Sequence, residues 1–340
     1  MLPGGTALLD VEPAILSVVI PTYHRPEPLA RAVASVLAQE LPEGTELEVV
    51  VAVSDRGSAT DRAAAEALRA DPRVRVVVAD RAGPAAARNA ALEVARGEVI
   101  GFTDDDCEAR PGWLRAGLRA LEGADMVQGR TVAASEKGPL DHAVTVEPPS
   151  WRWESCNLLV RRAAVEKAGP FDEEWNPTGV DGGHFGEDVE WGWRVVRAGA
   201  RTAFAPNAVV AHAVVPRGRV EFLRYQAKLR HLPGLTRRVP EVRRALVGGV
   251  FVSPRHAVVV GSAALLVAGG VLKLAGRRPS GWVAQGVAVA AFGWPERYHL
   301  EYAADDFRPL AKALGWRLVD EGVQLAALVR GSIEARRLVL

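Results

Sequence analysis

Hydrophobic and polar positions in the N-terminal part of the chain follow two alternating patterns. Continuous apolar runs, rich in β-branched residues, predict strands that are buried on both faces, at residues 15–20, 47–53, 74–79 and 98–103. Segments with an apolar stripe or a high alanine content predict the intervening helices, at residues 27–39, 61–70 and 85–95. This alternation predicts an α/β fold with a doubly wound sheet, which binds ligands at the carboxyl edge of its strands.

Beyond Pro111 the pattern is less regular. It predicts a helix at residues 113–121, short strands near 126–128 and 157–160, and a further helix that begins near Glu187. The strict alternation of strands and helices therefore ends soon after the fourth predicted strand.

Two apolar runs in the last third of the chain predict helices near residues 256–276 and 280–295. Such runs are typical of helices that insert into a membrane or lie on its surface. Helices buried in a soluble domain are the alternative, because Gly269, Gly270 and Lys273 weaken the first run. The second run is shorter than the ~20 residues that a simple span requires.

Charge is distributed unevenly along the 340 residues, a length that suits a catalytic core with an appendage. The formal net charge is only +1, yet the stretch between Arg217 and Arg255 is strongly basic and contains two acids, Glu221 and Glu241. Basic residues beside apolar runs are typical of a surface that faces anionic lipid. Nucleic acid explains them less well, because no recognised binding motif accompanies them. We therefore expect membrane association and no nucleic-acid partner.

The cysteines and the N-terminus indicate a cytoplasmic protein. Cys107 and Cys156 are the two cysteines and form no C-x-x-C pair, so neither a disulfide framework nor a thiolate zinc site is expected. Residues 1–14 lack the basic segment and apolar core of a secretion signal and are predicted to be an N-terminal extension. We expect the protein at the inner face of the cell membrane.

The strongest chemical signal is Asp104-Asp105-Asp106, directly after the fourth predicted strand. Three adjacent carboxylates repel one another, and a divalent cation would neutralise that repulsion. Hard oxygen ligands favour magnesium or manganese, which complete their coordination with diphosphate oxygens and water. An acidic turn that caps the next helix is the alternative interpretation.

A second acidic pair, Glu187-Asp188, lies where a helix is predicted to begin. The helix dipole stabilises ionised carboxylates in the first turn, so an ordinary helix start is the alternative to a catalytic role. Three further candidates are weaker on their own. Asp55 could contact a nucleotide base or form an Asx turn. Arg88 could bind a phosphate or form a surface ion pair. His212 could bind a metal or lie hydrogen-bonded in the core.

Six segments in register resemble the family 2 glycosyltransferases. They are VVIPTYHR (18–25), SDRGS (54–58), GPAAARNAAL (83–92), FTDDDC (102–107), GPFDE (169–173) and GEDVEWGWR (186–194). The resemblance implies a GT-A fold over residues 15–216, in which a Rossmann-like nucleotide-binding sheet is fused to an acceptor-binding half. Residues 217–340 are then a basic, helical C-terminal region that is outside the catalytic domain and contains the possible membrane helices.

The resemblance also implies a reaction. Family members move a sugar from a nucleotide-diphosphate donor, here most simply a UDP-sugar, to an acceptor hydroxyl with inversion. The acceptor would be a glycan or a lipid-linked sugar, in cell-envelope, polysaccharide or glycolipid synthesis. The Q-x-x-R-W pattern of processive synthases is absent from the sequence, which favours a single addition.

Carried over by position, the resemblance assigns roles to individual residues. Asp106 and His212 would hold Mn2+ or Mg2+, and Asp188 would be the catalytic base, which must lie within about 3 Å of the acceptor hydroxyl. Glu187 and Trp193 would lie on the acceptor side, although most tryptophans in this region are expected to pack in the core. The donor-binding residues would be Pro21, Thr22, Tyr23, Arg25, Asp55, Arg88, Asp104 and Asp105.

Other functional classes fit the sequence less well. A nucleotidyltransferase or sugar pyrophosphorylase should carry a glycine-rich basic loop after its first strand, and PTYHRPEPL is not one. A dinucleotide oxidoreductase should carry G-x-G-x-x-G at that position. A catalytically degenerate carbohydrate-binding membrane protein is disfavoured by the presence of both Asp106 and Asp188.

Overall fold

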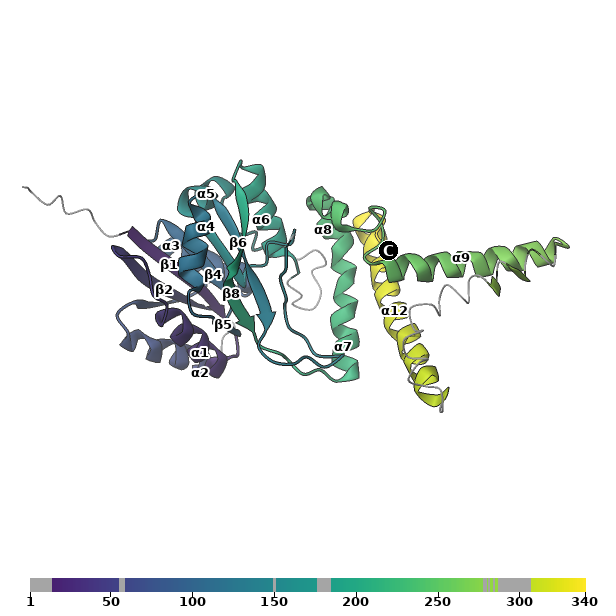
Figure 1. Ribbon diagram of the computed structural model, residues 1–340, viewed down its shortest axis with the longest axis horizontal. Coiled ribbons are helices and arrows are strands. Elements are labelled where there is room, and N and C mark those ends of the chain that lie inside the picture. Colours follow the sequence, from purple (N-terminus) through teal and green to yellow (C-terminus); the bar gives the residue numbers. More distant parts are fainter. Residues whose placement is uncertain are drawn as a thin grey trace, which may run out of the picture. The chain divides into compact units, whose positions relative to one another are not determined.

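A computed structural model describes residues 14–54, 59–148, 151–175, 185–277 and 307–340, together with 280, 282, 283, 285 and 286 (Figure 1). The chain divides into two compact units. The first comprises Met1–Asn176 and Val180–Pro216, and the second comprises Pro177–Gly179 and Arg217–Leu340. Most of the predicted N-terminal extension and the candidate Asp55 lie outside the described residues.

The first unit is built on one mixed, eight-stranded sheet in the order β3-β2-β1-β4-β7-β6-β8-β5. The strands β3, β2, β1 and β4 pair in parallel, as the alternating sequence pattern predicts. The sheet then changes direction, because β7 pairs antiparallel with both β4 and β6. The strands are β1 (Ala14–Thr22), β2 (Thr45–Val53), β3 (Val74–Val78), β4 (Val99–Thr103), β5 (Cys107–Ala109), β6 (Met126–Ala133), β7 (Asn157–Arg161) and β8 (Thr202–His212).

Helices cover both faces of this sheet, and strand side chains alternate between the two cores. In β2, Val49 and Val51 pack in one hydrophobic cluster, whereas Val50 packs in the other. The first cluster contains residues of α1, α2 and α4, and the second contains residues of α3, α5 and α6. These helices are α1 (Pro26–Leu37), α2 (Ala59–Ala67), which continues as the 3-10 turn η1 (Leu68–Ala70), α3 (Pro84–Val94), α4 (Trp113–Leu121), α5 (Arg162–Ala168) and α6 (Glu187–Arg197).

The elements that the hydrophobic pattern missed are short or irregular. The strand β5 has three residues and α5 has seven, which is too few for a clear period. The strand β8 contains Pro206, and its pairing with β6 shifts register between Gly129 and Arg130. Proline cannot donate a ladder hydrogen bond, so a strand pattern that contains one is weakened. The predicted strand at 126–128 extends to Ala133 in the structure.

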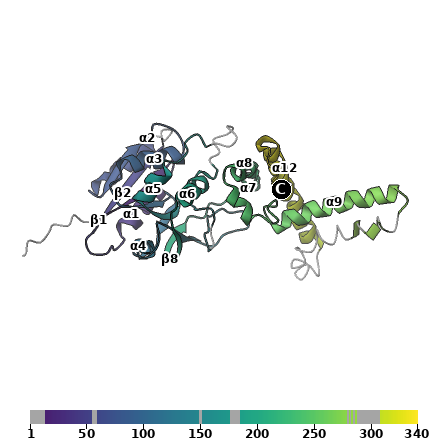
Figure 2. The same cartoon turned by 90° about the horizontal axis from the view of Figure 1, so that it is seen from above.

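The second unit is helical. Its long helix α12 contacts α7, α8 and the 3-10 turn η2, while α9 has few contacts with α12. Figures 1 and 2 both show most of α9 extending away from the other described helices of this unit. The elements are α7 (Arg219–Gln226), η2 (Ala227–His231), α8 (Leu232–Arg238), the 3-10 turn η3 (Pro240–Ala245), α9 (Pro254–Leu274) and α12 (Phe307–Ala335).

Among the described residues, α9 is the helix long and apolar enough to cross a membrane, judged by length and composition alone. Ser253 caps its start, where the Ser253 hydroxyl accepts a hydrogen bond from the His256 amide at 3.3 Å. The buried His256 and Glu321 side chains lie 3.2 Å apart and join the start of α9 to α12. Further along α9 the apolar side chains are exposed, such as Val267 at 68% and Leu274 at 91%. The second predicted apolar helix, near 280–295, lies largely outside the described residues.

Gly192 is a position where the fold leaves no space for a side chain. A Cβ atom added there would lie 2.4 Å from the Cβ of Trp153, which is attached to backbone and cannot turn away. We expect Gly192→Ala to destabilise the first unit by about 1–3 kcal/mol, the usual cost of overpacking. Gly123→Ala is the matched control, because a Cβ atom there meets nothing within 4 Å. Urea unfolding of the full chain measures both, and equal stabilities would contradict this packing.

Candidate active site

The triple aspartate forms the turn between β4 and β5, and β8 brings His212 beside it. The strands β5 and β8 are antiparallel, with Cys107 directly opposite His212. The Ala213 amide also donates a hydrogen bond to the Asp106 carbonyl at 2.8 Å. Two segments far apart in the sequence are therefore joined through their backbones at the carboxyl end of β4.

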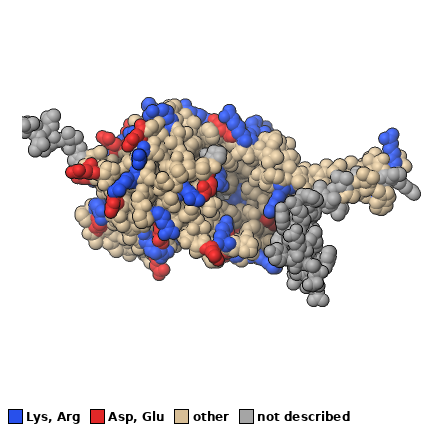
Figure 3. Space-filling view, viewed as in Figure 1, with Lys and Arg blue, Asp and Glu red and all other residues tan. Residues whose placement is uncertain are grey.

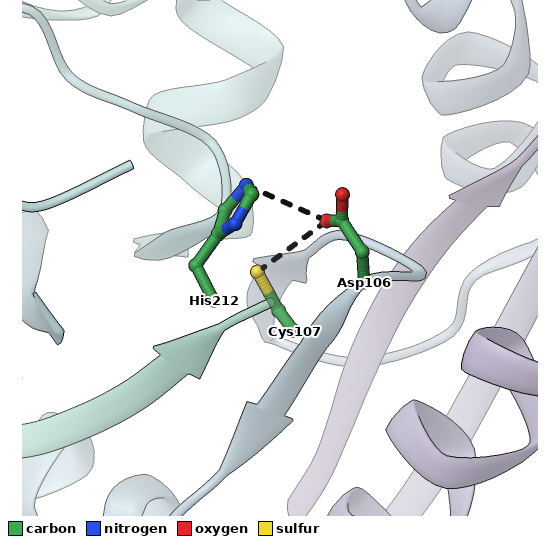
Figure 4. Close-up of side chains that lie close together, drawn as sticks. All are labelled: Asp106, Cys107 and His212. Atoms are coloured by element: carbon green, nitrogen blue, oxygen red, sulfur yellow. Dashed lines mark hydrogen bonds and ion pairs between the residues drawn. The ribbon is translucent and has the colours of Figure 1, made fainter. Parts of the chain in front are cut away.

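Asp106 and His212 form a pair of potential metal ligands (Figure 4). The His212 Nδ1 atom lies 2.8 Å from the Ala213 carbonyl oxygen, which can only accept a hydrogen bond, so Nδ1 carries the proton. In the neutral ring Nε2 then presents a lone pair, 3.6 Å from Asp106 Oδ1. A carboxylate oxygen and an oriented imidazole nitrogen are suitable donors for Mn2+, and the carboxylate also suits Mg2+.

Cys107 is the third potential ligand in this cluster, and no motif in the sequence marks it as one. Its Sγ atom lies 3.8 Å from Asp106 Oδ1. A hydrogen bond with Cys156 and burial of the sulfur raise the pKa of the Cys107 thiol well above its usual range. A raised pKa disfavours the thiolate, which is the form that binds metals. Asp106 and His212 are the better ligand pair.

The start of the β1–α1 connection encloses Asp105. Asp105 accepts hydrogen bonds from the Thr22 hydroxyl at 2.8 Å and the Tyr23 amide at 3.3 Å, and it pairs with Arg25 Nη1 at 3.0 Å. Arg25 also bonds to Asp106, and its side chain remains 45% exposed. Burial raises the pKa of Asp105 to about 6, against the opposing effects of Arg25 and Thr22.

These contacts bring together most of the residues predicted to bind the donor. Pro21 is buried near the end of β1, opposite Ala52 of β2, and Tyr23 is 49% exposed beside Asp105. Asp105 directs its oxygens to neighbouring protein groups, and Asp104, with a side chain that is 28% exposed, is the most open of the three aspartates. Whether any of them contacts a donor stays a prediction.

Arg88 joins the triple aspartate to the second acidic pair. Gly83 has a φ of 118°, which lets the chain turn into Pro84 and begin α3. From the second turn of that helix, Arg88 Nη2 bonds to Asp104 at 3.1 Å and Nη1 bonds to Glu187 at 3.3 Å. The two acidic motifs of the sequence are thus linked by one side chain.

Asp188 lies in the first turn of α6. Its carboxylate accepts hydrogen bonds from the Val189 amide at 2.8 Å and the Ser155 amide at 3.4 Å. Burial of the carboxyl group and the neighbouring Glu187 raise the pKa of Asp188 to about 7, although Arg88 lowers it. A general base is most effective when its pKa is close to the working pH. The sequence did not indicate Ser155, because it contributes a backbone amide rather than a motif side chain.

The tryptophans of α6 differ in their surroundings. Trp191 is fully buried, stacks on Phe171 with centroids 4.4 Å apart and donates to the Gly169 carbonyl, as expected of a core residue. Trp193 is partly exposed and donates to the Trp151 carbonyl at 2.9 Å. Its acceptor-side role remains a prediction.

The raised pKa of Asp188 implies a pH-dependent cost to stability. The folded state binds the carboxyl proton of Asp188 more tightly than the unfolded state does. The stabilising contribution of this proton to the free energy of unfolding is therefore fully present below pH ~4 and is lost as the pH rises through about 7. Asparagine cannot ionise, so Asp188→Asn should raise the melting temperature relative to wild type more at pH 8 than at pH 4.5. We expect a difference of at least about 2–4 °C, the effect of 1 kcal/mol in a unit of this size.

Calorimetric melting of the full chain at both pH values measures this difference. The exposed Asp80 supplies the control substitution, Asp80→Asn, for which we expect no such change with pH. A shift in melting temperature that is the same at both pH values for Asp188→Asn would contradict a raised pKa.

Comparison with known proteins identifies the family. Residues 17–169 match the family model described as glycosyl transferase family 2. Succinoglycan biosynthesis protein ExoM of Rhizobium meliloti is 31% identical over 237 residues, which cover 63% of this chain and 71% of that protein. Glycosyltransferase AglE of Haloferax volcanii is 28% identical over 227 residues, with 63% and 71% covered. The pre-mycofactocin glycosyltransferase of Mycobacterium tuberculosis is 29% identical, and the match spans 44% of its length.

A solved structure supports the fold. The mannosyltransferase PcManGT of Pyrobaculum calidifontis, a GT-A enzyme, is 20% identical and superposes with a TM-score of 0.54, covering 93% of this chain and 86% of that one. The predicted GT-A fold and the predicted family are both confirmed, and the nucleotidyltransferase and oxidoreductase alternatives are excluded. The chain belongs to glycosyltransferase family 2 and is a glycosyltransferase.

Proposed function

We propose that the first unit transfers a sugar from a nucleotide-diphosphate sugar to an acceptor hydroxyl by a metal-dependent, inverting single displacement. One observation carries this proposal. The Asp106–His212 pair and a carboxylate with a pKa of about 7, Asp188, belong to one bonded cluster, connected through Asp104, Arg88 and Glu187. Metal binding and proton transfer are the two requirements of such a displacement.

In this proposal Asp106 and His212 hold Mn2+ or Mg2+. The bound ion would supply positive charge against the diphosphate leaving group. PcManGT is described in complex with GDP-Man and Mn2+, which supports a nucleotide-sugar donor and a divalent ion for a protein of this fold. UDP-sugars are our first candidates for the donor and GDP-sugars the second. Pro21, Thr22, Tyr23, Arg25 and Asp55 would then surround the nucleotide.

Asp188 would accept the proton of the acceptor hydroxyl as that oxygen attacks the anomeric carbon. Its carboxylate is held by two backbone amides, which fixes its direction. Above pH ~7 it is mostly ionised and able to accept a proton. Glu187 would lie on the acceptor side and orient the acceptor. The partly exposed Trp193 would stack on a sugar ring of the acceptor.

Two matched substitutions separate the proposed roles. We expect Asp188→Asn to lower transfer by on the order of 100-fold or more, because it removes the base, while Mn2+-dependent nucleotide binding stays nearly unchanged. We expect Asp106→Asn to weaken that binding as well, because it removes a metal ligand. Calorimetric titration with UDP and GDP, each with and without Mn2+, measures binding, and release of nucleoside diphosphate from the matching nucleotide sugar measures turnover.

Each result has a clear consequence. Full turnover in Asp188→Asn would remove the base from the mechanism. Nucleotide binding that needs no divalent ion, and that Asp106→Asn leaves unchanged, would remove the metal. The exposed Asp80 again provides a control substitution of equal charge change.

We further propose that the second unit binds the anionic cytoplasmic face of a membrane, where the acceptor would be a glycan or a lipid-linked sugar. The surface of α9 is apolar and largely exposed. Figure 3 shows it almost free of charge, with basic side chains at its outer end. Arg237, Arg244 and Arg255 are exposed in the segments that precede or begin α9. An apolar helix flanked by arginines suits the boundary between acyl chains and anionic headgroups.

Vesicle flotation tests this association. The full chain should float with vesicles of phosphatidylcholine and phosphatidylglycerol and bind pure phosphatidylcholine less well. Replacing Arg237, Arg244 and Arg255 with glutamine should lower the partition coefficient on the order of a hundredfold, because each arginine near the surface contributes about 1 kcal/mol. Replacing the exposed Arg69, Arg115 and Arg119 of the first unit is the control. If wild type and both triple variants floated equally well with both kinds of vesicle, an electrostatic contribution of these arginines to membrane binding would be contradicted.

A further inference from the structure

Arg88 is a buried cation whose two terminal nitrogens are already bonded to protein. Its side chain is 5% exposed. Nη2 bonds to Asp104 in the turn after β4, and Nη1 bonds to Glu187 in the first turn of α6. The Phe171 ring lies 5.6 Å from the guanidinium carbon. At 5% exposure this guanidinium offers little surface to a donor diphosphate, although its buried Nε atom has no hydrogen-bond partner among the described residues.

Arg25 provides the contrast. It also bonds to two acids of the triple aspartate, but its side chain is 45% exposed and can reach a ligand. The position of Arg88 in the motif suggested a donor contact, whereas its burial and its partners indicate a role within the protein.

Several charged groups surround the Asp188 carboxylate. Glu187 precedes it on α6, Glu154 faces it from the segment before β7, and Arg88 faces it from α3. Arg152 pairs with Glu154 at 2.6 Å. Two acids therefore act against ionisation of Asp188, and the positive charge of Arg88 favours it.

We propose that Arg88 is a positioning residue for the base, which fixes Glu187, places a positive charge beside Asp188 and ties the start of α6 to the Asp104 turn. This role rests on the proposed function of Asp188. Because one guanidinium bonds to both segments, the base and the metal-binding turn keep a constant separation. Loss of the guanidinium would also leave Glu187 and Asp104 partly buried without their counter-charge.

The test is a titration of Asp188 in the full chain. Aspartate labelled with 13C at the carboxyl carbon reports its ionisation by NMR, and Asp188→Asn identifies the signal. We expect Arg88→Gln to raise the titration midpoint by about one pH unit or more, the effect of removing an opposite charge at this range. Arg88→Lys keeps the charge and should restore most of the shift. Mn2+-dependent binding of UDP or GDP, whichever binds wild type, should be unchanged in both.

The pH profile of turnover should follow the titration. The acidic limb for Arg88→Gln should move to higher pH by the same amount, so activity at pH 6.5 falls about tenfold and recovers at pH 9. Arg81→Gln, an exposed arginine close to α3 in sequence, is the matched control. If Arg88→Gln does not fold, Arg88→Met, which also removes the charge, carries the same titration and should raise the midpoint by a similar amount.

An unchanged midpoint in the charge-removing variant, or loss of nucleotide binding in Arg88→Lys, would overturn the proposal and make Arg88 a donor ligand or a purely structural residue. Failure of the proposed function would appear differently. Asp188→Asn would then retain turnover, while the midpoint of Asp188 would still depend on Arg88.

Discussion

Mutual repulsion among carboxylates at the carboxyl edge of the sheet is the constraint on which the site depends. Asp104, Asp105 and Asp106 follow one another in a turn, and Glu187 and Asp188 come close to them from α6. Two arginines compensate this charge in different ways. Arg25 is half-exposed and bonds to Asp105 and Asp106, whereas Arg88 is buried and bonds to Asp104 and Glu187. The half-exposed cation remains accessible from solvent, and the buried one joins the two acidic segments.

The change of strand direction in the sheet makes this meeting of acids possible. A purely parallel sheet would gather only the turns that follow its own strands. Here β7 reverses direction beside β4, and β8 returns parallel to β6, so that its end reaches the Asp106 turn. The parallel half therefore supplies the aspartates, and the antiparallel half supplies His212 and the amide of Ser155 that holds Asp188.

The elements that depend on local sequence pattern could be predicted, whereas the contacts that depend on pairing between distant segments could not. The parallel strands, α1 to α4 and the start of α6 follow from periodicity and charge at helix ends. The contact between His212 and Asp106 does not, because it arises from a three-residue strand paired with one that contains Pro206. Ser155 and Cys107 carry no motif that marks them. Arg88 was identified by its motif, but only the structure shows that it is buried and that its terminal nitrogens bond to Glu187 and Asp104.

The two oxygens of Asp106 show how this arrangement suits a cation. Oδ1 faces His212 and Cys107, while Oδ2 bonds to Arg25. Asp106 and His212 would hold a divalent ion, which would supply positive charge at this end of the sheet. Arg25 already supplies a fixed positive charge to the same carboxylate. Because that bond orients the Asp106 side chain without an ion, the carboxylate would need little reorganisation when an ion binds.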